Sequence, residues 1–102
     1  MNLSELRPGM EELELSVKLL GLNEPKEVET YTGLKHTIVE GKVTDGTDTL
    51  DFTVWNEAIE MLDKIKPGEK IQLLNAFITS YKGELAVNIG RESEINKIVE
   101  AE

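Results

Sequence analysis

The chain has 102 residues and a formal net charge of −9, from 20 acidic and 11 basic side chains. This length suits one domain with one core. The absence of cysteine excludes disulfides, thiolate metal sites and cysteine nucleophiles, and the single histidine disfavours a histidine-based active site. The sequence shows neither a signal peptide nor a long apolar run, so we expect no membrane segment and a cytoplasmic location.

Apolar and polar residues alternate with period two between glycine and proline clusters, which is typical of β-strands. The alternation predicts strands over residues 12–19, 35–43, 49–55, 69–81 and 84–89. Apolar residues recur at helical spacing over residues 57–65, which predicts a helix there with Asn56 as its N-cap. Gly21 is expected to bend the first strand.

The order of these elements is strand, strand, strand, helix, strand, strand. It predicts an all-β fold with one helix, namely a five-stranded Greek-key OB-fold barrel with the helix between strands 3 and 4. An SH3-like barrel and an open α+β sheet are the alternatives. We expect a single OB-fold domain over residues 1–102, with a short N-terminal segment over residues 1–11 and a polar tail over residues 91–102.

Three aromatic residues take positions of the polar face. In the third predicted strand, the alternation leaves Trp55, the only tryptophan, pointing away from the core. In the fourth, Ala76 and Ile78 face the core, which leaves Phe77 and Tyr81 pointing outward. Apolar residues earlier in this strand have the opposite parity, so either its early part is buried on both faces or a bulge near residues 74–75 switches the register. Nucleobases stack on such rings, so the three predict a stacking platform. Alternatively, Trp55 packs under the helix and the other two cover a barrel end.

Short motifs along most of the chain resemble the archaeal single-stranded DNA-binding proteins and the related OB domains of archaeal replication protein A. These motifs lie at residues 3–10, 40–47, 50–56, 74–77 and 81–85. The resemblance implies an OB fold that binds single-stranded DNA in replication, recombination or repair, with little sequence preference. It also implies that Trp55, Phe77 and Tyr81 stack with the bases.

Basic residues near these rings are the candidates for phosphate contacts. Lys82 adjoins Tyr81, and Lys35 and Lys42 lie on the second predicted strand. Asp51 stands where the family commonly has a basic or neutral residue. A carboxylate beside a phosphate path repels it, so Asp51 and the net charge of −9 together predict weak binding.

A second interpretation is an OB-fold module for protein–protein contact, or a subunit of a larger replication protein A, with weak or no nucleic-acid binding. The exposed aromatic rings would then be interface anchors, and the acidic charge favours this interpretation. RNA is a further candidate ligand, because stacking does not distinguish the two sugars. The sequence holds no nucleophile–base pair, and the acidic residues 45, 48 and 51 do not match a calcium loop, so we expect no enzyme, metal or cofactor.

Overall fold

The computed structural model describes residues 2–81 and 83–98. Its strands are β1 (Leu13–Leu22), β2 (Lys26–Glu29), β3 (Lys35–Thr44), β4 (Thr49–Trp55), β5 (Lys70–Tyr81), β6 (Glu84–Ile89) and β7 (Glu94–Lys97). Two 3-10 helices are present in these residues, η1 (Leu3–Glu5) and η2 (Asn56–Lys64). No helix in the described part of the chain combines the length and apolar character needed to cross a membrane.

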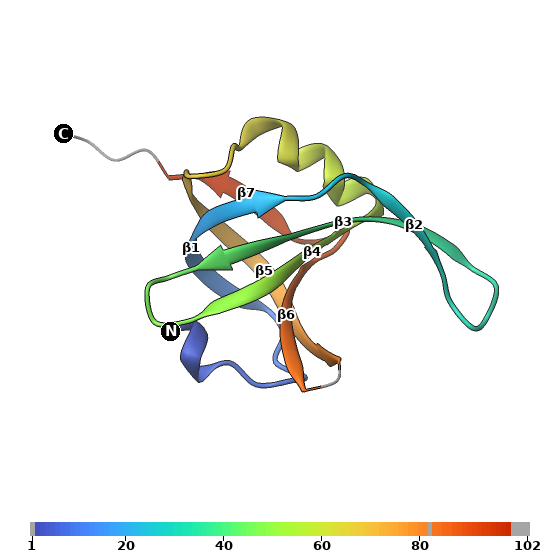
Figure 1. The fold of residues 1–102 in the computed structure, drawn as a ribbon, viewed down its shortest axis with the longest axis horizontal. Coiled ribbons are helices and arrows are strands. Elements are labelled where there is room, and N and C mark those ends of the chain that lie inside the picture. The colour runs from blue at the N-terminus through green and yellow to red at the C-terminus, as the bar shows by residue number, and fades with distance from the viewer. Residues whose placement is uncertain (1, 82, 99–102) are drawn as a thin grey trace.

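Five of the strands close into a ring (Figure 1). They follow the order β1, β3, β4, β6 and β5, and the pairing of β5 with β1 closes the ring. The pair β4–β6 is parallel, and the other pairs of the ring are antiparallel. With η2 between β4 and β5, this arrangement confirms the predicted OB fold.

The interior of the ring is filled by the apolar residues that the alternation assigned to it. Phe52 and Val54 of β4 are fully buried, as are Val87 and Ile89 of β6. Ala58 of η2 is also part of this core. Burying such side chains stabilises the fold by roughly 1.5–3 kcal/mol each, and the two-residue period of a strand leaves the intervening residues facing outward.

A bulge in β5 changes which face of the strand is buried. Leu15 of β1 pairs with Leu73, whereas Leu13 pairs with Ala76, so β5 has one residue more than its partner between these pairs. Asn75 lies in the extra stretch with a left-handed φ of 57°, a conformation that asparagine adopts more readily than most residues. The bulge interpretation is confirmed, because the buried positions shift from odd to even numbers there.

Two short strands were not predicted. One of them, β7, lies within residues 91–102, where a polar tail was expected, and pairs with β5. Ile95 of β7 is buried, and Lys97 forms an ion pair of 2.5 Å with Glu69. The other strand, β2, pairs with β3 in a hairpin that extends away from the ring (Figure 1).

The prediction of Asn56 as a helix N-cap was also wrong. Asn56 is the first residue of η2, Trp55 holds the N-cap position, and no side chain caps the helix. The amide of Asn56 bonds to β3 instead: its Oδ1 accepts the backbone N–H of Thr37 at 3.0 Å, and its Nδ2 lies 3.0 Å from Nδ1 of His36. The side chain therefore ties the start of η2 to β3.

The turn between β3 and β4 is held by one carboxylate. Asp45 accepts hydrogen bonds from the backbone N–H of Leu3 at 2.7 Å, from the hydroxyl and N–H of Thr47 at 2.6 and 2.9 Å, and from the N–H of Asp48 at 3.3 Å. Partial burial raises the pKa of Asp45, but these hydrogen bonds outweigh it and lower the pKa to about 2. The ionised carboxylate joins the N-terminal segment to the turn.

Candidate nucleic-acid interface

One outer face of the ring runs across β3, β4, β6 and β5. Register places Trp55 of β4 opposite Ile38 of β3, and Thr53 opposite Asn88 of β6. On its other side, Asn88 lies opposite Phe77 of β5. The strands thus bring Trp55 and Phe77 to the same face, with Asn88 between them.

Trp55 is half-buried at the end of β4, and two side chains hold its indole. Its Nε1–H donates a hydrogen bond of 3.0 Å to Oδ1 of Asn88. The ring of His36 on β3 meets it edge-on, with centroids 5.7 Å apart and planes at 83°. These contacts connect the indole to β3 on one side and to β6 on the other.

Phe77 is partly buried, and its ring lies close to the backbone at Gly90. A Cβ atom at that position would come within 3.3 Å of Cε1 of the ring, closer than ordinary contact distance. Phe77 also lines an open pocket whose wall includes Arg91 and Ser93. Glycine at position 90 therefore gives the ring space beside the turn that follows β6.

The third predicted stacking residue lies at the end of the same strand. Tyr81 closes β5, and its backbone pairs with Glu84 at the hairpin that leads to β6. Its backbone lies two residues beyond Thr79 and four residues beyond Phe77 along β5. Lys82 lies outside the described residues. The roles of Tyr81 in stacking and of Lys82 in phosphate contact therefore both stay predictions.

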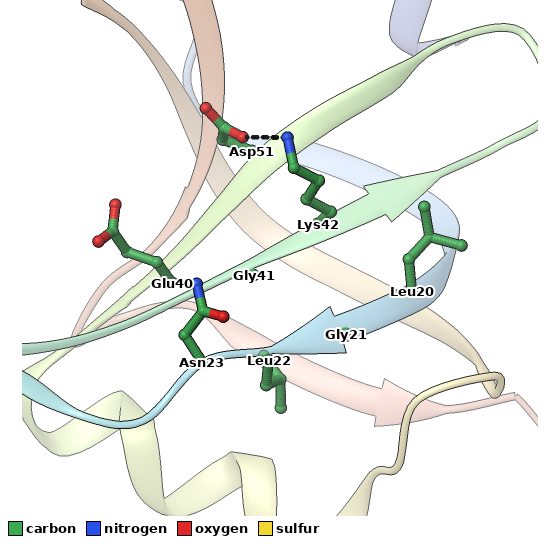
Figure 2. Close-up of a pocket in the computed structure, with 8 residues that line it drawn as sticks. All are labelled: Leu20, Gly21, Leu22, Asn23, Glu40, Gly41, Lys42 and Asp51. Carbon is green, nitrogen blue, oxygen red and sulfur yellow. Dashed lines mark hydrogen bonds and ion pairs between the residues drawn. The ribbon is translucent and has the colours of Figure 1, made fainter.

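The predicted phosphate contact Lys42 lies on this outer face but is already paired. Its Nζ donates to Oδ1 of Asp51, 3.0 Å away on β4 (Figure 2). This hydrogen bond, followed by the charge of Asp51, raises the pKa of Lys42 above its ordinary value. The two side chains border a groove whose lining also includes Leu20, Gly21, Leu22, Asn23, Glu40 and Gly41. A phosphate entering this groove meets a neutral pair instead of a free cation.

The structure does not bring Lys35 to the same face. It pairs with Glu29 in the β2–β3 hairpin and has the opposite strand parity to Lys42. Its Nζ lies 3.7 Å from Oε1 of Glu27. The two strand lysines proposed as phosphate contacts therefore stand on different sides of β3, each beside a carboxylate.

Sequence reasoning missed Asn88, which is only 2% exposed although it belongs to the outer face. In the predicted strand over residues 84–89, Asn88 simply alternates with apolar residues. A usable signal exists, since asparagine is depleted in strands and this one lies between two apolar residues, Val87 and Ile89. Such a position needs a local hydrogen-bonding partner.

A comparison with known families identifies the class. Residues 6–97 match the family described as "Single-stranded DNA binding protein Ssb-like, OB fold". The match covers most of the chain, and the chain belongs to this family.

Individual relatives agree with the family match. Over 90 residues the chain is 31% identical to the single-stranded DNA binding protein Ssb of Saccharolobus solfataricus, a match that covers 88% of this chain and 58% of that protein. This chain thus spans 58% of the length of that relative.

Solved structures share the fold at lower identity. The replication factor A related protein from Methanobacterium thermoautotrophicum superposes with a TM-score of 0.80 at 20% identity, covering 96% of this chain and 89% of that one. The second OB-fold domain of replication protein A from Methanococcus maripaludis gives a TM-score of 0.76 at 19% identity, covering 100% and 97%. These similarities establish the OB fold.

Proposed function

We propose that this chain binds single-stranded DNA without catalysis, by stacking bases on the outer face that carries Trp55, Phe77 and Tyr81. Membership of the Ssb-like family supports this activity. Within the cell the protein would cover transiently exposed strands during replication, recombination or repair, and we place it in the cytoplasm. Because stacking is tolerant of base identity, binding would show little sequence preference.

The observation that supports this proposal most strongly is the shared face of Trp55 and Phe77. Trp55 and Phe77 come from two strands that are not neighbours in the ring, and β6 joins them through Asn88 into one continuous face. Aromatic rings spread over one sheet face can contact successive bases of an extended strand. The arrangement therefore suits a ligand that is long, flexible and rich in flat rings.

Trp55 is the chain's only tryptophan and reports directly on this site. We would titrate the protein with an oligo-dT of about 15 nucleotides, a length within the usual range of OB-fold sites, and follow intrinsic fluorescence. Quenching at micromolar DNA is the expected result. An oligo-rU of equal length tests DNA against RNA. Absence of quenching at low salt and high DNA concentration would contradict the proposal.

The paired lysines favour a second candidate, a protein-contact module. Lys42 and Lys35 both stand beside carboxylates, and the chain carries a charge of −9. A polyanion gains little from such a surface, whereas a basic protein partner would be attracted to it. If the oligonucleotides leave Trp55 fluorescence unchanged, a pull-down with immobilised protein, using Trp55→Ala as the matched control, tests this candidate.

A further inference from the structure

The amide of Asn88 is a buried polar group in the middle of a binding face. Asparagine is mostly exposed in proteins, and burying an amide is unfavourable unless its donors and acceptor are hydrogen-bonded. Asn88 is 2% exposed. Within residues 2–81 and 83–98, every buried side-chain nitrogen and oxygen has a hydrogen-bond partner, so this amide is satisfied by protein groups.

Its hydrogen bonds run to both neighbouring strands. On the β5 side, Nδ2 lies 2.9 Å from Oγ1 of Thr79 and 3.3 Å from the carbonyl oxygen of Phe77. It also lies 3.1 Å from the carbonyl oxygen of Ala86. On the β4 side, Oδ1 accepts the indole N–H of Trp55 at 3.0 Å.

These partners leave the amide one orientation. A rotated amide would turn its oxygen toward the carbonyl oxygens of Phe77 and Ala86, which are acceptors only, and its NH₂ group toward the indole donor. The acceptor of Asn88 therefore faces Trp55 before any ligand arrives. His36 meets the same indole edge-on, so the ring is held from two sides.

We propose that Asn88 is a positioning residue, which holds the indole of Trp55 in its stacking orientation and thereby strengthens the binding of single-stranded DNA. The inference rests on the proposed function. Ordering a side chain at an interface weakens association, and a ring fixed in advance avoids that loss. Removing Asn88 should weaken DNA binding about 2- to 12-fold, which corresponds to the usual ordering cost of about 0.5–1.5 kcal/mol at about 1.4 kcal/mol per factor of ten.

A double-mutant cycle separates positioning from general support of the fold. The variants are Asn88→Ala, Trp55→Phe and the two combined, each assayed by polarisation of the same oligo-dT carrying a label. Phenylalanine keeps an aromatic face but has no N–H donor. We expect Asn88→Ala to weaken binding about 2- to 12-fold in the wild-type background and less than about twofold in the Trp55→Phe background. Equal losses in both backgrounds, or no loss in the wild-type background, would overturn the proposal.

The free protein gives a second readout. Loss of Asn88 should speed hydrogen exchange of the Trp55 indole N–H, measured by NMR, and reduce the near-ultraviolet circular dichroism of the indole. Thr79→Val is the matched control: it removes one hydrogen bond of Asn88 but leaves the carbonyl oxygens of Phe77 and Ala86 to hold the amide, so the indole signals should change less than in Asn88→Ala. If Asn88→Ala does not fold, Asn88→Leu preserves most of the volume without the acceptor and should give the same shifts. An unchanged indole signal in a folded variant would refute the positioning role.

The experiment also distinguishes the two proposals. A wild-type protein that fails to bind oligo-dT and oligo-rU overturns both. A wild-type protein that binds, with an Asn88→Ala variant that binds equally well, overturns only the role of Asn88.

Discussion

On β4, Phe52 and Trp55 lie three residues apart and face opposite sides of the ring. The inner side is apolar throughout, and its residues are buried by one another. The outer side also contains buried residues, namely Ile38, Thr53 and Asn88. These residues lie on the face that carries the half-buried aromatic rings. Burial therefore does not separate core from candidate site in this molecule. What separates them is whether the buried residue fills the interior or supports an aromatic ring at the surface.

Phe52→Ala should have the largest effect, and only on the inner side. Phe52 is fully buried, and truncating such a ring typically costs about 3–5 kcal/mol of unfolding free energy, since a cavity remains. Urea unfolding followed by circular dichroism measures the loss. The DNA affinity of the fraction that stays folded should match wild type, and reduced affinity of that fraction would show that the two sides are coupled.

Trp55→Ala should have the converse effect. Losing one stacked base costs roughly 1–3 kcal/mol of binding free energy, while unfolding free energy should fall by much less than for Phe52→Ala. Polarisation of labelled oligo-dT reports the first quantity and urea unfolding the second. A variant that unfolds as readily as Phe52→Ala would place Trp55 with the core instead of the site.

Asp51→Asn tests the charged end of the outer face, with a smaller expected effect. The change frees Lys42, so affinity for oligo-dT should rise a few-fold. The slope of log K against log salt should steepen by about 0.7, the contribution of one phosphate contact to a single strand. Asp63→Asn on η2 makes the same change in net charge away from the face, and an equal rise with that control would assign the effect to overall charge.

Asp45→Asn tests the turn between β3 and β4, which lies outside both faces. The folded pKa of Asp45 is about 2, below the ordinary carboxyl value of 3.8. Its stabilising contribution is thus present above that ordinary value and is lost as the pH falls through about 2. Asp45→Asn should lower the urea midpoint at neutral pH, and the gap to wild type should narrow as the solution is acidified through this window. A gap that is constant with pH would mean that the carboxylate charge contributes nothing.

The inner side was predictable because strand alternation records it directly. Phe52 and Val54 differ from their neighbours in polarity, and the same rule placed Trp55 outside. The pairing of Lys42 with Asp51 depends on the register between β3 and β4, which the alternation does not specify. The burial of Asn88 depends on partners from two other strands, and a buried asparagine and an exposed one look alike in sequence.

The short strands escaped prediction for a different reason. β2 reads Lys-Glu-Val-Glu and β7 reads Glu-Ile-Asn-Lys, each with a single apolar residue. Charged side chains are typical of edge strands, where they discourage pairing with other molecules. The composition that protects these edges is also what made them look like loops.

The extra residue at Asn75 has a consequence for the evolution and design of this strand. It divides β5 into two stretches with opposite parity. Odd-numbered residues are buried before the bulge and even-numbered residues after it, so the same substitution affects the core at different positions in the two stretches. Deleting one residue there would exchange the faces on which Ala76 and Phe77 lie: the phenyl ring would turn into the core and the alanine would turn outward. Anyone grafting this face onto another OB scaffold must transfer the bulge together with the rings, and small insertions or deletions should be tolerated far better in the β2–β3 hairpin tip than here.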